Sequence, residues 1–107
     1  MIKVSILYPN KPDARFDMDY YLNKHMPMAI ELLSAAHGYQ GVTVERGLSG
    51  TTPDAPPTYV VMCHFLFDSA ELYLDGFRPH RAVLQGDVPN YTNIETIIQF
   101  SEVAIDI

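Results

Sequence analysis

The chain has 107 residues, of which 48% are hydrophobic and 19% are charged, and its 13 acidic and 7 basic residues give a formal net charge of −6. This length predicts a single domain over residues 1–107, and the apolar fraction excludes an intrinsically disordered chain. No apolar run approaches the ~20 residues that span a membrane, and no basic cluster can neutralise nucleic-acid phosphates, so we expect neither a membrane nor a nucleic acid as partner.

The cysteine content and the first residues bear on the cellular compartment. The lone cysteine, Cys63, excludes an intrachain disulfide and is typical of a reducing environment. The first residues, MIKVSILYP, lack the basic region, the long apolar stretch and the small-residue cleavage site of a secretory signal. We therefore expect a cytoplasmic protein whose chain begins with a strand.

The first forty residues predict a strand followed by a helix. Ile2–Tyr8 alternates with the period of two that is expected of a strand. Asp17 can cap a helix, and from there to Ala36 the apolar residues share one helical face before Gly38 ends the helix. Pro27 removes one backbone hydrogen bond inside this helix, which predicts a kink.

Two further strands and a loop occupy the middle of the chain. Val42–Leu48 predicts the second strand, and the Gly- and Pro-rich segment Ser49–Pro57 predicts a loop. Thr58–Phe67 predicts a third strand that is largely apolar on both faces, with Cys63 on one face and His64 on the other.

The last third of the chain predicts a broken helix and a final strand. Asp68–Glu71 resembles a capping box, in which the first residue caps the helix and the fourth is acidic. The helix then runs toward Gln85, with interruptions near Gly76 and Pro79. Asn93–Val103 alternates as the fourth strand.

The element order βαββαβ predicts an α+β domain. Two helices of this length cover only one face of a four-stranded antiparallel sheet, which is the ferredoxin-like arrangement. The other face must be solvated or covered, and a third strand that is apolar on both faces makes a large wet face unfavourable. We therefore expect a homodimer in which two copies pack sheet against sheet around a two-fold axis.

His25 is the most informative polar residue of the first helix, because it falls at the centre of the apolar face. A buried imidazole needs hydrogen-bond partners, since leaving its nitrogens unsatisfied costs about 1–3 kcal/mol. Two interpretations stay open at this point. His25 is either a core histidine bonded to a backbone carbonyl or tyrosine hydroxyl, or a general acid or base on a cavity wall, to which an ordinary imidazole pKa of ~6.5 is suited.

Other candidate residues are less well determined by their spacing. Phe77 and His80 share the inner face of the second helix if that helix continues through Pro79. His64 either lines a space between two sheets or packs under a helix, and Cys63 is typical of an inert buried thiol. No histidine or cysteine spacing typical of a metal site and no phosphate-binding glycine loop occurs, so we expect no metal and no nucleotide fold.

Two parts of the chain resemble the signature of EthD-like proteins. Phe16–Pro27 (FDMDYYLNKHMP) resembles the first-helix motif with its His-x-Pro ending, and Gly86–Asn93 followed by Gln99–Val103 is similar to the last turn and strand. The resemblance implies a dimeric α+β barrel that acts on a small, often aromatic or polyketide-like molecule without metal or organic cofactor. EthD-like members are commonly labelled reductases or linked to ether degradation by oxygenase systems, although this sequence has no recognisable nicotinamide or flavin motif.

The resemblance also bears on the site. His25 matches the family motif best, and Tyr21 and Tyr91 are motif positions as well. We therefore expect His25 to be catalytic, with no metal and no cofactor. The expected substrate-binding residues are these two tyrosines, Tyr21 and Tyr91, together with Met28, His64, Phe77 and His80, which rest on the faces they are expected to share and not on the motif.

These residues predict a small-molecule enzyme with a pocket between the first helix and the sheet. In this hypothesis His25 moves a proton during an enolisation, dehydration, cyclisation or cofactor-independent oxidation of an apolar or aromatic metabolite, and the oxidoreductase label is one member of that set. One alternative is a non-catalytic module that binds a hydrophobic metabolite or associates with an oxygenase. Another is a barrel filled by side chains, which the absence of a cavity of at least ~300 Å³ would favour.

Overall fold

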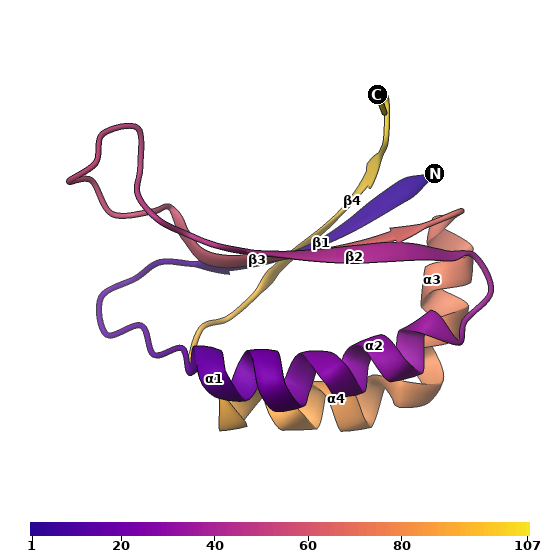
Figure 1. Ribbon diagram of the computed structural model, residues 1–107. Coiled ribbons are helices and arrows are strands. Elements are labelled where there is room, and N and C mark those ends of the chain that lie inside the picture. The colour runs from indigo at the N-terminus through magenta and orange to yellow at the C-terminus, as the bar shows by residue number, and fades with distance from the viewer.

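The computed structural model describes residues 1–107 and contains one antiparallel sheet with helices on one of its faces (Figure 1). The spatial order of the strands is β2-β3-β1-β4, so β1 and β3 form the centre of the sheet. This arrangement confirms the predicted ferredoxin-like α+β architecture. The strands are β1 (Ile2–Pro9), β2 (Tyr39–Arg46), β3 (Tyr59–Phe67) and β4 (Ile97–Glu102).

The first helix is continuous but changes its winding part-way along. In its middle turn the Met26 N–H donates to the carbonyl oxygen of Tyr21, five residues back, which is the wider π-helical pattern. Pro27 follows directly; it has no N–H to donate, and its ring crowds the carbonyl four residues earlier. The interruption expected at Pro27 therefore takes the form of a widened turn just before it. The segments are α1 (Met18–Tyr20), η1 (Tyr21–His25) and α2 (Met26–Ser34).

Both ends of this helix follow from local chemistry. The carboxylate of Asp17 accepts a hydrogen bond from the Tyr20 N–H at 3.1 Å, which confirms the predicted cap. The helix ends at Ser34, two residues before the predicted Ala36. Gly38 then adopts a φ of +85°, a left-handed conformation that favours glycine.

The second helical region is broken, as predicted, around Pro79. Ser69 caps it by accepting a hydrogen bond from the Leu72 N–H at 3.2 Å, so the predicted cap at Asp68 was wrong by one residue. Asp68 instead accepts a hydrogen bond from Gln40 at 2.8 Å. The segments are α3 (Ala70–Phe77), the 3₁₀ turns η2 (Arg78–His80) and η3 (Val88–Asn90), and α4 (Arg81–Asp87) between them.

The fourth strand begins at Ile97 rather than at the predicted Asn93, because the preceding residues are held elsewhere. The Asn93 side chain accepts a hydrogen bond from the Arg15 N–H at 2.8 Å, and the Thr92 hydroxyl donates to the Arg15 carbonyl at 2.7 Å. These bonds tie the segment before β4 to the loop that precedes the first helix. They bring the start of the first EthD-like segment, next to Arg15, close to the end of the second, which contains Thr92 and Asn93.

The two faces of the sheet have different surroundings. Alternate residues of β3, including Val61, Cys63 and Phe65, are buried under the helices, and their neighbours Met62 and His64 are half-buried on the opposite face. The sequence predicted that one face of the sheet would need a cover, and this is the face without helices.

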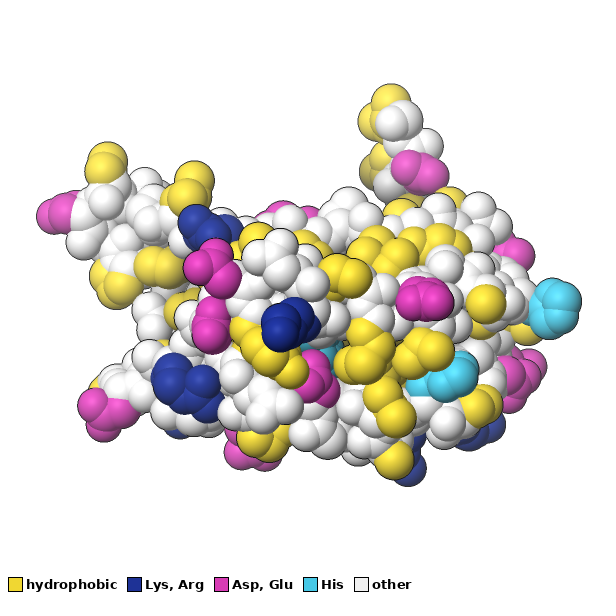
Figure 2. All heavy atoms as spheres, turned by 60° about the horizontal axis from the view of Figure 1, so that its bottom comes forward, with side chains coloured by type: hydrophobic (Ala, Val, Ile, Leu, Met, Phe, Trp, Pro, Cys, Tyr) yellow, Lys and Arg dark blue, Asp and Glu magenta, His cyan; other side chains and the backbone are white.

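The helix side of the molecule carries exposed apolar atoms across its middle and dispersed basic side chains (Figure 2). None of the helices combines the length and the apolar character needed to cross a membrane.

Candidate active site

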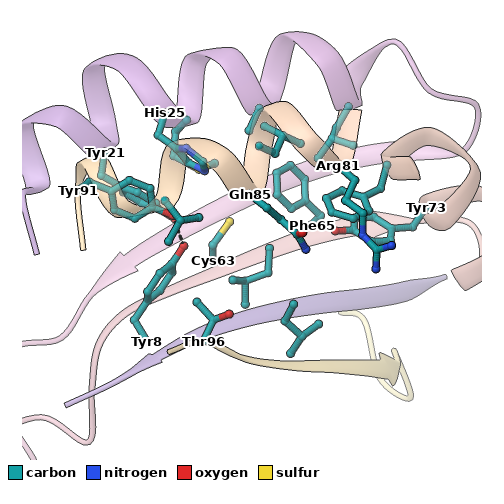
Figure 3. A pocket seen from close by; sticks show the side chains of 18 of the residues that line it. Tyr8, Tyr21, His25, Cys63, Phe65, Tyr73, Arg81, Gln85, Tyr91 and Thr96 are labelled. Atoms are coloured by element: carbon teal, nitrogen blue, oxygen red, sulfur yellow. Dashed lines mark hydrogen bonds between the residues drawn. The ribbon is translucent and has the colours of Figure 1, made fainter. Parts of the chain in front are cut away.

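A cavity of about 260 Å³ lies between the helices and the sheet (Figure 3). Most of the side chains that line it are apolar or aromatic, including Phe65 and Leu33, and they come from β1, β3, β4 and the helical segments. Its volume is slightly below the ~300 Å³ at the lower end of typical ligand sites. By the criterion set from the sequence, this volume counts toward the alternative of a barrel filled by side chains. The space that remains is still large enough for a molecule of one or two rings.

His25 lies on the wall of this cavity, and its side chain is only 10% exposed. Its Nδ1 lies 2.9 Å from Oδ2 of Asp87. Its Nε2 makes no hydrogen bond to the protein, and since no fully buried side-chain nitrogen lacks a partner, Nε2 keeps an accessible edge. One nitrogen of the imidazole is thus held by the protein and the other is free for a ligand.

The carboxylate of Asp87 is held on both of its oxygens. Oδ1 accepts a hydrogen bond from the Tyr20 hydroxyl at 2.6 Å and another from the Asn90 amide at 2.9 Å, and Oδ2 faces His25. Partial burial raises the pKa of Asp87, but the hydrogen bonds from Tyr20, Asn90 and His25 outweigh it and leave this pKa below its ordinary value. The group is therefore a carboxylate at neutral pH, and Nδ1 of His25 carries the proton that it accepts.

Two buried tyrosines pack against the imidazole, and a third is hydrogen-bonded to one of them. The ring of Tyr21 stacks on that of His25 at 5.7 Å and 13°, and the ring of Tyr91 lies 4.6 Å away. The hydroxyls of Tyr8 and Tyr91 are 2.7 Å apart and form a hydrogen bond. Burial raises the pKa of all three phenols well above the ordinary value, so they are neutral hydrogen-bond donors at physiological pH.

The local sequence explains how these groups meet. Tyr21 and His25 are the first and last residues of η1, and the widened turn directs both toward the sheet. Asp87 is the last residue of α4, where the chain enters η3, and there it lies against η1. A π-helical turn inside an α-helix is often found at a functional site, and here it carries the two inward-facing residues.

Cys63 also lines the cavity but is not a reactive nucleophile. It lies in the middle of β3 and is 1% exposed. Burial raises the pKa of its thiol to about 12, so the thiolate that would be needed for nucleophilic attack is not populated at neutral pH. This supports the interpretation of Cys63 as a packed thiol.

Four of the residues expected at the site line the cavity, and three do not. His25, Tyr21, Phe77 and Tyr91 belong to the lining. Met28, His64 and His80 are outside it.

The physical reasons for these three exceptions are distinct. The widened turn η1 shifts the helical phase of the residues that follow it, including Met28. His80 lies in η2, where the 3₁₀ turn around Pro79 breaks the face that it would have shared with Phe77. His64 lies on the sheet face away from the helices.

His64 is engaged in a separate polar cluster on that face. Its Nδ1 is 2.7 Å from the Ser5 hydroxyl, and its Nε2 is 3.1 Å from a carboxylate oxygen of Glu45. The cluster links β1, β2 and β3 across the sheet. His64 therefore does not contribute to the cavity under the helices.

The structure adds residues to the site that the sequence did not single out. Asp87, Tyr8, Arg81 and Gln85 were not among the expected residues, although Asp87 lies within the family-like segment Gly86–Asn93. The signal for Asp87 was weak, because an aspartate beside a proline turn is ordinary turn chemistry. No three histidine, cysteine or carboxylate side chains lie close enough together to hold a metal ion.

Comparison with known proteins identifies the domain. Residues 12–95 match the EthD domain. The chain belongs to the EthD family. An EthD-like protein from Ralstonia eutropha JMP134 is 44% identical, with 98% of this chain and 93% of that chain covered and a TM-score of 0.90.

More distant EthD and ferredoxin-like structures share the fold. An ethyl tert-butyl ether D (EthD) family protein from Bacillus halodurans C-125 is 18% identical, with 95% and 97% of the two chains covered and a TM-score of 0.65. A dimeric ferredoxin-like protein from an uncultured marine organism is 13% identical, with 100% and 98% covered and a TM-score of 0.56. No curated protein matches this EthD domain.

Proposed function

We propose that this EthD domain is a small-molecule enzyme in which His25 transfers a proton to or from a ligand in the cavity. The observation that carries the proposal is the hydrogen bond between Nδ1 of His25 and the Asp87 carboxylate, while the other nitrogen of this cavity-lining ring makes no hydrogen bond to the protein. A general base needs an accessible lone pair and a fixed orientation, and this pair supplies both. A merely structural core histidine would have both of its nitrogens occupied.

The proton chemistry follows from the charge of Asp87. Because this carboxylate is ionised, it keeps the proton of His25 on Nδ1 and leaves the lone pair on Nε2. When Nε2 takes a proton from a carbon next to a carbonyl group, the electron pair of the C–H bond forms a carbon–carbon double bond. The π electrons of the carbonyl group then move to its oxygen, and the product is an enolate. The positive charge that develops on His25 is then stabilised by Asp87 at 2.9 Å.

The tyrosines can stabilise the oxygen on which negative charge develops. In the hydrogen bond between Tyr8 and Tyr91 one hydroxyl donates to the other, which leaves the proton of the second hydroxyl for a neighbouring acceptor such as Tyr21 or for a ligand. Such a proton can bind a substrate oxygen inside an apolar cavity, where the interaction is stronger than in water. We infer an enolisation, dehydration or cyclisation of a carbonyl compound, without an organic cofactor.

The walls and size of the cavity define the class of ligand. A volume of about 260 Å³ and largely apolar walls favour a flat aromatic or alicyclic molecule of one or two rings. Polar groups are concentrated at a few points of the wall, which is typical of sites that orient a ligand.

We also propose that the protein is a homodimer built through the sheet face without helices. Leu7 and Met62 are neighbours on this face and are only half-buried, and Ile97 beside them is 51% exposed. A second copy would remove these groups from water. A structural neighbour with the same fold is described as dimeric, which supports this assembly.

The test of the enzyme proposal uses 2-tetralone, a two-ring ketone with acidic hydrogens next to its carbonyl group. Deuterium uptake at these positions in D₂O is followed by proton NMR with and without protein. We expect the protein to accelerate uptake above the buffer rate and the variant His25→Gln to abolish this acceleration. His37→Gln is the matched control, because His37 is exposed and does not line the cavity.

The outcome separates an enzyme from a binding module. If 2-tetralone binds, as judged by line broadening, and uptake stays at the buffer rate, the chain is a binding module for compounds of this kind. If uptake is equally fast in His25→Gln, the proposed role of His25 is wrong. The non-catalytic alternative predicts that the affinity survives this substitution and that no rate depends on it.

A further inference from the structure

The two ends of the cavity differ in charge. His25 lines one end, and the ionised Asp87, which does not itself line the cavity, is hydrogen-bonded to its imidazole there. Arg81, the first residue of α4, and Gln85, one helical turn later, line the cavity away from that end, and their side chains extend from α4 across it toward the sheet (Figure 3). Both residues are exposed, so a cation and an amide donor lie where the cavity meets solvent, and the carboxylate of Asp87 lies at the other end of α4.

Arg81 has no partner within the protein. Its guanidinium makes no hydrogen bond and no ion pair, whereas Arg78 pairs with Asp75 at 3.5 Å and Arg15 donates to the Pro89 carbonyl at 3.0 Å. It is also the only lysine or arginine among the residues that line the cavity. A guanidinium presents its donors in a planar fork that matches the two oxygens of a carboxylate.

The spacing along α4 sets the length of a matching ligand. Arg81 and Asp87 are the first and last residues of α4, and six steps of ~1.5 Å separate their backbones by about 9 Å. A fused two-ring system with a carboxylate at one end is of comparable length. With its carboxylate at Arg81, such a molecule extends along the cavity toward His25, which lines it as well.

The charges also determine how an anionic ligand is oriented in the cavity. A carboxylate next to Asp87 would be repelled by it, and the formal net charge of −6 disfavours anions over the molecule as a whole. A preference for an anionic ligand therefore requires a local cation, and Arg81 is the one that the cavity offers.

We propose that the cavity binds a flat aromatic or alicyclic carboxylate, with its carboxylate on Arg81 and Gln85 and its reacting end at His25. This inference rests on the proposed function, because it names the class of substrate for the same site. Arg81 is a specificity-determining residue: it selects acids over neutral molecules of the same shape and orients them along α4.

The test compares 2-naphthoate with 2-naphthamide, which have the same rings but differ in charge. Isothermal titration calorimetry gives both affinities for the wild-type protein, for Arg81→Gln and for the control Arg78→Gln on the adjacent turn. We expect the wild type to bind 2-naphthoate about tenfold more tightly than the amide. Arg81→Gln should bring the two affinities to within about twofold by weakening the acid alone, and Arg78→Gln should behave as the wild type.

Salt concentration provides a second measurement on the unmodified protein. Added sodium chloride should weaken 2-naphthoate binding and leave 2-naphthamide binding unchanged, because only the acid has a charge to screen. Equal binding of the two probes by the wild type overturns the inference, as does a preference that persists in Arg81→Gln, and the cavity remains a ligand site in both cases. If neither probe binds, the inference is wrong, and the deuterium uptake of 2-tetralone then decides whether the proposed function falls with it.

Discussion

Replacement of Asp87 by asparagine tests whether this residue orients His25. Both side chains have the same shape, but an amide has one accepting oxygen and one donating nitrogen. Tyr20 and Asn90 both donate to Oδ1 of Asp87, so the amide oxygen is expected to stay with them. The amide nitrogen then faces Nδ1 of His25 and donates to it, which moves the imidazole proton to Nε2, the nitrogen on the cavity side.

The size of the effect follows from this reversal. A general base contributes about 10²- to 10⁴-fold to a reaction rate, and Nε2 with a proton cannot act as a base. We therefore expect Asp87→Asn to reduce the accelerated deuterium uptake of 2-tetralone by at least about a hundredfold. All three hydrogen bonds can still form, the one with His25 in the reverse direction and none of them to a charged group, so the free energy of unfolding should fall by only about 1–2 kcal/mol.

The dependence of stability on pH provides a separate readout. The pKa of Asp87 is lower in the folded protein than its ordinary value of 3.8, so its contribution to stability is present above that value and is lost as the pH falls through the folded pKa. Urea unfolding at pH 7 and at pH 3 should therefore show a smaller difference in Asp87→Asn than in the wild type. Asp75→Asn is the control, because Asp75 is exposed and its pair with Arg78 lies on the surface.

The two readouts separate an orienting role from a structural one. A loss of rate with a nearly normal free energy of unfolding at pH 7 is the result that we expect. A variant that is stable and keeps the wild-type rate would refute the tautomer argument and remove Asp87 from the mechanism.

Three further substitutions test the packing of the site and the assembly. Tyr8→Phe leaves the buried Tyr91 hydroxyl without its partner at 2.7 Å, so urea unfolding should show a loss of about 1–2 kcal/mol, and an unchanged value would contradict the hydrogen bond. Gly76→Ala places a methyl group 2.5 Å from the side chain of Ala36, so thermal unfolding should show a destabilisation of about 1–3 kcal/mol; unchanged stability would mean that α3 and the end of the first helix do not approach so closely. Leu7→Glu puts a charge on the sheet face without helices, so light scattering at micromolar concentration should give the mass of one chain for the variant and two for the wild type. A wild-type mass of one chain would contradict the homodimer.

Most of the fold could be predicted because its signals are local. The alternation in Ile2–Tyr8 and Thr58–Phe67 and the helical spacing after Asp17 each depend on a few neighbouring residues. One error, the cap of the second helix, occurred where two local choices were nearly equal. Asp68 and Ser69 are both good caps, and the hydrogen bond between Asp68 and Gln40, 28 residues apart, was not visible in the sequence.

The site could be predicted only in part, because its geometry depends on how distant segments pack. His25 stood out, since it was polar at the centre of an apolar helical face and belonged to a recognisable motif. Asp87, 62 positions later, joins it only after α4 has packed against the first helix. Met28 and His80 were misplaced because the winding of their helices departs from 3.6 residues per turn, at η1 and at η2.

The most direct test of the central claim is the tautomer of His25, measured by long-range ¹⁵N–¹H NMR at pH 8. The signals of this ring are identified by their absence from the spectrum of His25→Gln. We predict a proton on Nδ1, a bare Nε2, and a shift of the Nε2 resonance when 2-tetralone is added. A proton on Nε2, or an Nε2 resonance that stays in place at saturating 2-tetralone, would contradict the account.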